Sequence, residues 1–339
     1  MEYFFYFCLF IFGTLFGSFG SVIIYRLKSG EGGISSGRSH CPKCNTILKA
    51  LDLLPIISWV VNKAKCRYCK EKVSSIYPLL ELSTGILFYF IGYFLIDFNL
   101  ISEINILEIT KLLFWLSIGF ITILYTFYDI LFLEIHEGIL LTGTGIILVG
   151  LGAQTLFQDI VLINVLPSGI ENLSIGISAI FITLIIIGIL YIIMLKELHE
   201  IIDISLILLS IGILYLFKIQ TGINLSDIAI LNGLIGVLII FLFFFTQIMI
   251  SRGKWMGGGD LRIAIMIGLI LGVSFSPPGL MLTYMAGSII GTLFIIQNRI
   301  KNKGGNLNTQ IPFGPFLAIG FFLTIFYSTE IGNIISIYF

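Results

Sequence analysis

The sequence predicts an all-α membrane protein, a polytopic bundle of about eight to ten spanning helices with one small cytoplasmic loop. The chain has 339 residues, of which 57% are hydrophobic and only 11% are charged, and its mean hydropathy is +1.06. Soluble domains carry roughly a quarter charged residues. The formal net charge is zero, which argues against a nucleic-acid partner and leaves membrane lipid as the expected surroundings.

Apolar runs of about 17–25 residues are long enough to cross a bilayer. Ten such runs are predicted as spans, and Pro277 and Pro278 separate the eighth from the ninth. The runs cover residues 3–25, 77–96, 112–128, 138–157, 173–195, 204–218, 228–250, 261–276, 279–297 and 312–330. The first run lacks a basic start and a small-residue cleavage site, so it is interpreted as a permanent helix.

The basic residues predict the orientation of the chain. Ten of the 19 Lys and Arg residues lie between Arg26 and Lys72, so this loop is placed in the cytoplasm. Alternating through ten spans leaves Lys111 and Lys218 outside, and the other 17 basic residues obey the positive-inside rule. Both termini then lie outside. The predicted division is a first span at 1–27, a cytoplasmic loop at 28–75 and a membrane domain at 76–339.

The cytoplasmic loop contains two CxxC motifs, whose pattern and separation are typical of a zinc ribbon. The four cysteines are Cys41, Cys44, Cys66 and Cys69. Four thiolates complete a tetrahedron around one ion and leave no open position, so the predicted site is structural, with zinc favoured over iron. A pair of disulfides is the alternative, and a reducing cytoplasm argues against it.

Two carboxylates are predicted at the ends of spans. Asp260 directly follows Gly257, Gly258 and Gly259 at the start of an apolar run. A carboxylate there is either functional or a helix cap. Asp129 ends the third span, where the helix dipole disfavours a negative charge. Four predicted spans separate the two, an even number, so both are expected on the same side of the membrane.

Two further features border the cytoplasmic loop. Gly17, Ser18, Gly20 and Ser21 form a small-residue face, which favours close helix packing. Glu81 lies about one turn into the second span, where a snorkelling interfacial carboxylate and a functional one are both open.

Taken together, these blocks resemble the type IV prepilin leader peptidases, the GxGD-type aspartic membrane peptidases that are bifunctional peptidase/N-methyltransferases. The matching blocks are GSFGSVIIYRL, the paired CxxC motifs, DLLPIISW with YPLLELSTG, the Asp129 block, and MGGGDLRI with IPFGPFLA. The resemblance implies that Asp129 and Asp260 are the catalytic pair. The three glycines beside Asp260 are expected to admit an extended substrate backbone.

The resemblance also implies the partners and cofactors. It implies leader cleavage of type IV prepilin or pseudopilin precursors at the cytoplasmic face of a bacterial membrane, a zinc-binding loop, and N-methylation of the new terminus with S-adenosylmethionine. It makes no prediction about oligomeric state.

The chain departs from the family pattern at several positions. The family usually has Asn at Ser21, Pro-Asp at His136-Glu137 and Arg at Ile76. The stretch of chain from Asp129 to Asp260 is about twice as long as is usual in the family, which predicts an insertion of two spans near residues 158–225.

Two other classes of function fit parts of the sequence. A proton-coupled transporter would use Asp129 and Asp260 as an intramembrane site, but no internal repeat is visible and the cysteines stay unexplained. A noncatalytic membrane scaffold carrying a zinc module leaves the glycine run before Asp260 without a purpose.

Overall fold

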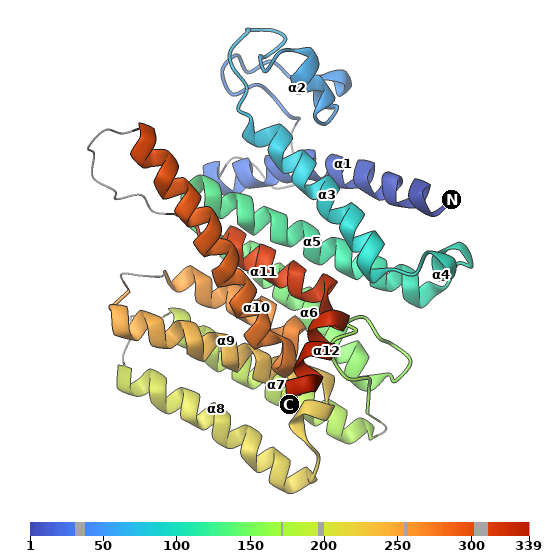
Figure 1. Cartoon of the computed structure of the whole chain (residues 1–339), viewed down its shortest axis with the longest axis vertical. Coiled ribbons are helices and arrows are strands. Elements are labelled where there is room, and N and C mark those ends of the chain that lie inside the picture. The colour runs from blue at the N-terminus through green and yellow to red at the C-terminus, as the bar shows by residue number, and fades with distance from the viewer. Residues whose placement is uncertain (31–37, 171, 196–199, 254–256, 302–310, 339) are drawn as a thin grey trace. The chain divides into compact units, whose positions relative to one another are not determined.

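The computed structural model describes residues 1–30, 38–170, 172–195, 200–253, 257–301 and 311–338, and within these ranges it is a helical membrane protein (Figure 1). Eight described helices are long and apolar enough to cross a membrane, or up to nine if one bent pair counts as a span. The all-α prediction is confirmed. The chain forms two compact units, residues 1–131 and 132–339, while the domain division predicted from the sequence stays a prediction.

The first unit consists of three long apolar helices and a cysteine module, residues 38–75, inserted between the first two. Its elements are α1 (Glu2–Ser29), η1 (Ala50–Leu53), α2 (Ile57–Val61), α3 (Ile76–Leu95), α4 (Phe98–Ser102) and α5 (Ile106–Phe132), the last reaching one residue into the second unit. Helix α1 ends because Gly30 turns left-handed (φ 69°) and its N–H donates to Arg26 O. The chain then leaves the helix for the module.

Helices α1 and α3 pack closely through small residues. A Cβ on Gly17 would lie 2.6 Å from the Cα of Glu81, and one on Gly13 would lie 2.8 Å from the Cα of Gly85. Gly20 instead faces α5, where a Cβ would meet Leu124 at 3.2 Å. Close helix packing is therefore confirmed at Gly17, against α3, and at Gly20, against α5.

The second unit contains the remaining long helices, and its most extensive packing is between α9 and α10. Its elements are α6 (Glu137–Leu156), α7 (Leu173–Leu195), α8 (Glu200–Thr221), η2 (Leu225–Asp227), α9 (Ala229–Ser251), α10 (Gly258–Lys301), α11 (Gly314–Phe326) and α12 (Ser328–Tyr338). Within the part of this unit that the structure describes, α8 packs mainly against α7, on the outer side of the unit (Figure 1).

Helix α10 is broken at Gly272, which takes φ 62° and ψ −165° inside an otherwise helical stretch. Its 44 residues would be about 66 Å long if straight, roughly twice the hydrocarbon thickness of a bilayer. Asn232 of α9 stabilises the break, because its Oδ1 accepts from Val273 N at 2.9 Å. The prediction of a boundary at Pro277-Pro278 was wrong by about one turn: both prolines lie within the helix after the break.

The last predicted span, 312–330, is also corrected. The structure divides this region into α11 and α12, which meet at an angle of 76°. Helix α11 has 13 residues, about 20 Å, and is too short to cross a bilayer unaided.

Candidate functional site

The four cysteines of the module come together. Their Sγ atoms all lie within 4.8 Å of one another, and Cys41 Sγ lies 3.9 Å from Cys69 Sγ. Four sulfurs at about 2.3 Å from a zinc ion stand about 3.8 Å apart, so the cluster fits a tetrahedral metal ion. With four thiolate ligands, such a site is closed and structural. All four cysteines are free thiols in the structure, which argues against the disulfide alternative.

The two CxxC turns have the same backbone conformation. Asn45 N–H donates to Cys41 O at 2.8 Å, and Lys70 N–H donates to Cys66 O at 3.0 Å. Both donors are left-handed, with φ 53° and φ 62°. Antiparallel bridges close both turns, His40 with Ile47 and Lys65 with Lys72. Each turn therefore presents two thiols from one short loop.

The thiols differ in acidity. Hydrogen bonds from Thr46, through its side chain first and then its backbone, lower the pKa of Cys44 to about 6. At Cys69, a backbone hydrogen bond from Glu71 acts to lower the pKa of the thiol. Desolvation and hydrogen bonds with the other three cysteines outweigh it and raise the pKa of Cys69 to about 11. A bound cation would favour the thiolate form of all four.

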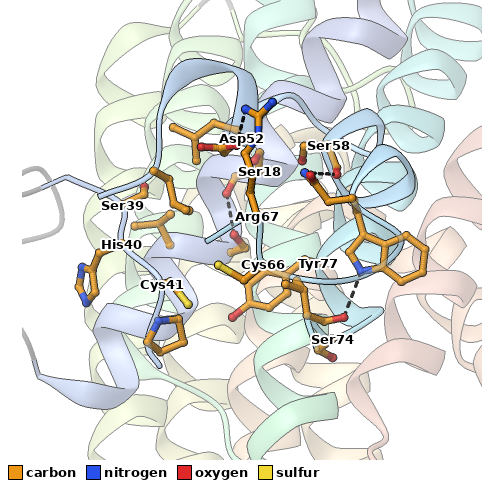
Figure 2. Close-up of a pocket in the computed structure, with 18 of the residues that line it drawn as sticks. Ser18, Ser39, His40, Cys41, Asp52, Ser58, Cys66, Arg67, Ser74 and Tyr77 are labelled. Carbon is orange, nitrogen blue, oxygen red and sulfur yellow. Dashed lines mark hydrogen bonds and ion pairs between the residues drawn. The ribbon is translucent and has the colours of Figure 1, made fainter. Parts of the chain in front are cut away.

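A cavity of about 410 Å³ lies between the cysteine module and the membrane helices α1 and α3 (Figure 2). Ser18 and Ser21 of α1 line it, together with Tyr77 of α3. Cys41 and Cys66 line the side of the module, so the cavity is next to the candidate metal centre.

Glu81 lies on the wall of this cavity and is 8% exposed. Its Oε2 accepts from Ile56 N at 2.7 Å, and the Ser18 hydroxyl also donates to its carboxylate. Glu81 is therefore buried and held by hydrogen bonds, and the snorkelling alternative is wrong. The sequence offered one signal for it, a carboxylate within an apolar run.

Asp52 joins the loop between the CxxC turns to the second turn. Tyr68 Oη donates to Asp52 Oδ2 at 2.8 Å, and Arg67 Nη1 lies 3.3 Å from Oδ1. Burial acts to raise the pKa of Asp52, but the hydrogen bonds from Tyr68 and the Lys49 backbone and the charge of Arg67 lower it below its ordinary value. This residue was not predicted as part of a site.

Asp129 lies in the last turn of α5 and is 6% exposed. Thr126 Oγ1, one turn earlier, is buried and has no hydrogen-bond partner among the described residues. Buried polar atoms of this kind are rare and mark polar sites.

Asp260 lies in the first turn of α10 and is 9% exposed. It is the third residue of the helix, so it is not the cap residue that one interpretation of the sequence allowed. Two residues later, Arg262 pairs with Glu137 at 2.8 Å, which joins the starts of α10 and α6. Asp129 belongs to the first unit and Asp260 to the second.

The three glycines before Asp260 differ in their surroundings. A Cβ on Gly257 or Gly258 would meet nothing within 4 Å, whereas one on Gly259 would lie 2.9 Å from Ile135 Cδ1. None of the three has a positive φ. The glycines therefore provide space beside the backbone rather than an unusual backbone conformation.

Comparison with known proteins identifies the N-terminal region. Residues 11–95 match the model of the bacterial peptidase A24 N-terminal domain. This range covers most of α1, the whole cysteine module and α3. The N-terminal region is therefore similar to this family domain.

Several curated relatives are named prepilin leader peptidase/N-methyltransferase. The protein from Myxococcus xanthus is 41% identical over 81 residues, 24% of each chain. The protein from Vibrio cholerae is 34% identical over 121 residues, 30% of this chain and 48% of the relative. The protein from Bacillus subtilis is 40% identical over 84 residues, 24% of this chain and 32% of the relative. No solved structure matches the chain.

The resemblance to this family is thus confirmed. The alignments span about a quarter to a half of the length of these relatives. Asp129 and Asp260 lie outside the 11–95 match.

Proposed function

We propose that this chain is a bacterial prepilin leader peptidase that also N-methylates its product, embedded in the cytoplasmic membrane. The observation that carries the proposal is a family-matched N-terminal domain in a chain with two buried aspartates at the ends of membrane helices. Its proposed substrates are type IV prepilin or pseudopilin precursors, and the relatives' names support this by indicating prepilins and prepilin-like proteins.

Asp129 and Asp260 are the proposed catalytic pair, facing the cytoplasm. Two features of the second unit support the pairing. Ile135, which follows Asp129 closely in the chain, lies against Gly259, and Glu137 forms an ion pair with Arg262. The segment that follows Asp129 is therefore fixed to the residues on both sides of Asp260.

The two carboxyl groups have opposite helix environments. Asp129 lies at the C-terminal end of α5, where the partial negative charge of the helix disfavours an anion. Asp260 lies at the N-terminal end of α10, where an anion is stabilised. We therefore assign the ionised, general-base role to Asp260 and the protonated, general-acid role to Asp129.

Peptide hydrolysis then follows from one shared proton. Asp260 accepts a proton from water as the water oxygen attacks the scissile carbonyl carbon, while Asp129 donates its proton to the carbonyl oxygen. The C–N bond breaks as the leaving nitrogen takes a proton from the pair. The open space beside Gly257 and Gly258 suits an extended substrate backbone.

Zinc is the proposed ion of the cysteine cluster, since four sulfur ligands in tetrahedral reach favour it. Bound there, it would hold the two CxxC turns together and would take no part in hydrolysis. S-adenosylmethionine is the proposed methyl donor, as the relatives' methyltransferase name implies.

The inserted spans are proposed to be α7 and α8. In support, α8 packs mainly against α7 within the described part of the unit, as expected for an addition at the edge of a bundle.

Co-expression with a type IV prepilin tests the peptidase. We expect Asp129→Asn and Asp260→Asn each to reduce leader cleavage at least a thousandfold, measured as the size shift on a gel, with normal membrane insertion. Asp203→Asn is the matched control, because Asp203 is also buried, at 3% exposed, but lies in α8. Cleavage near the wild-type rate in either catalytic variant would overturn the assignment.

A further inference from the structure

The segment between the two CxxC turns exposes apolar side chains, although it is not part of a spanning helix. It contains the short helices η1 and α2, and its most exposed apolar side chains include Leu51, at 66%, and Val61, at 70%. We call five of them, none of which lines the cavity, the apolar face: Leu51, Leu54, Ile57, Val60 and Val61. Exposed apolar patches mark surfaces that bind a protein or a membrane.

Helix α2 has one side toward the cavity and one side away from it. Ser58 and Trp59 line the cavity (Figure 2), and the indole N–H of Trp59 donates to Val73 O at 3.1 Å. Ile57 and Val61 are four residues apart and therefore share the other, exposed side. A contact within the module thus fixes the orientation of α2 and keeps the apolar face directed outward.

Hydrogen bonds set the depth of this segment beside the membrane helices. Ile56 N–H donates to Glu81 Oε2 at 2.7 Å, and the Ser18 hydroxyl donates to the same carboxylate. The cavity wall extends from Ser18 to Arg26 of α1, so the module lies alongside the last turns of this helix.

The lengths of the two helices relate this depth to the bilayer. Helix α1 has 28 residues and is about 42 Å long, which exceeds the hydrocarbon core by roughly 12 Å, the rise from Ser18 to Arg26. Helix α3 is about as long as the core is thick, and Glu81 lies about 8 Å from its start. Ile56 is therefore level with the boundary between the headgroups and the hydrocarbon.

The apolar surface of the membrane helices continues at this level. Phe19 of α1, next to Ser18, is exposed, and so is Leu82 of α3, next to Glu81. The apolar face of the module therefore extends a surface that already contacts lipid, at a depth where interfacial helices bury their apolar side.

The charge of the module indicates which lipids it binds. Residues 38–75 contain eight Lys and Arg residues and two acidic residues, a net charge of +6, and a zinc ion held by four thiolates would leave the module positive. Lys49 and Lys63 are exposed and flank the apolar face in the chain. The carboxylate between them, Asp52, is paired with Arg67. Basic residues beside an apolar face favour membranes that contain anionic lipids.

We propose that the cysteine module is docked on the bilayer, with its apolar face about 5–10 Å deep in the leaflet on its own side and with Lys49 and Lys63 on anionic headgroups. Docking adds a second attachment to the hydrogen bond at Glu81, so the module is held at two points. A second copy of the chain fits this face less well, because its module has the same positive charge. The inference does not depend on the proposed peptidase or on methyl transfer.

Hydroxyl-radical footprinting of the purified full-length chain tests the docking, in nanodiscs that hold a single chain in phosphatidylcholine and phosphatidylglycerol. We expect the apolar face to be labelled about fivefold less than Ile47, after correction for intrinsic reactivity, because lipid covers it. Ile47 is the internal reference, since it is an exposed apolar residue of the same module outside the apolar face. In phosphatidylcholine alone, labelling of the face should rise about twofold, because the anionic headgroups are absent.

A first pair of substitutions removes part of the apolar contribution. Ile57→Gln with Val61→Gln should raise the labelling of Leu51 and Val60 to the level of Ile47, because amide side chains resist entry into the hydrocarbon. Both replaced side chains are exposed, so the module should fold. Protease resistance of residues 38–75 checks the fold of each variant.

A second pair of substitutions removes the electrostatic contribution. Lys49→Gln with Lys63→Gln should make labelling in the anionic nanodiscs equal to that of the wild type in phosphatidylcholine. Lys43→Gln with Lys70→Gln is the matched control. It removes the same charge from two exposed lysines of the CxxC turns and should leave the protection unchanged.

Three results would overturn the docking. The first is labelling of the apolar face equal to that of Ile47 in the anionic nanodiscs. The second is protection that requires two chains in one nanodisc or an added prepilin, since another copy or the substrate would then cover the face. The third is wild-type protection in both the Ile57/Val61 and the Lys49/Lys63 variants, which would mean that neither contribution holds the segment.

Discussion

The two CxxC turns of the cysteine module share a backbone and differ in their electrostatics. Residues 39–48 and 64–73 have the same hydrogen bonds at corresponding positions, including Leu48 N–H to Ser39 O and Val73 N–H to Ala64 O. Their sequences, SHCPKCNTIL and AKCRYCKEKV, share only the cysteines. The cysteine spacing and its hydrogen bonds thus define the turn, while the neighbouring residues set the acidity of each thiol.

The largest expected effect is loss of the metal when the cysteines of either CxxC turn are replaced. Cys41→Ser with Cys44→Ser, or Cys66→Ser with Cys69→Ser, should each remove the metal completely, because two thiolates cannot close the site. Structural zinc sites contribute about 10–16 kcal/mol in small peptides, so residues 38–75 should also become sensitive to protease. Metal content by plasma mass spectrometry should be about one zinc per wild-type chain and none in either double variant. Cys8→Ser, in α1, is the control, and metal retained by either double variant would contradict the four-ligand site.

A smaller effect is expected from the different acidities of Cys44 and Cys69, which should alter how fast each thiol is alkylated. After chelation of the metal at pH 7, we expect iodoacetamide to modify Cys44 roughly a hundredfold faster than Cys69, because the thiolate is the nucleophile. With its pKa at about 6, Cys44 stays reactive at neutral pH and loses reactivity as the pH falls below that value. Thr46→Val should raise the pKa of Cys44 and slow the modification of this thiol at pH 7. Peptide mass spectrometry measures each site, and equal rates would show that the neighbouring residues do not distinguish the thiols.

The smallest effect concerns the left-handed residue that closes each turn. Asn adopts this conformation readily and Lys does not, so Lys70→Gly should stabilise the module by about 0.5–1 kcal/mol. Asn45→Gly should change it by a few tenths at most. Resistance of the full-length, zinc-bound chain to proteolysis in urea measures both. A larger gain in stability from Asn45→Gly than from Lys70→Gly would contradict this account, in which the strain at φ 53° and φ 62° depends on the residue type.

The sequence predicted the helical membrane fold, because long apolar runs leave few alternatives to spanning helices. It also predicted the cysteine cluster, since CxxC spacing fixes local geometry. It missed the break at Gly272, because the break depends on Asn232 of another helix accepting from Val273 N. Pro277 and Pro278 are visible locally in the sequence, whereas Asn232, whose side chain stabilises the break at Gly272, is distant in the chain.

The cavity was missed for a similar reason. Glu81, Ile56 and Ser18 come from three segments, and their proximity depends on how closely Gly17 lets α1 approach α3. The sequence therefore left Glu81 open between two interpretations. For Asp129 and Asp260, span counting predicted a shared side of the membrane, and the structure adds that both are buried. Their catalytic roles stay a prediction.

The cysteine module precedes the second unit in the chain, and this order has a consequence for biosynthesis. All four cysteines precede residue 70, so the module could bind the proposed metal while the second unit is still being synthesised. The hydrogen bond from Ile56 to Glu81 can form as soon as the second turn of α3 has been made. If zinc is the ion, as proposed, a shortage of zinc during translation would impair the module before either aspartate had been added.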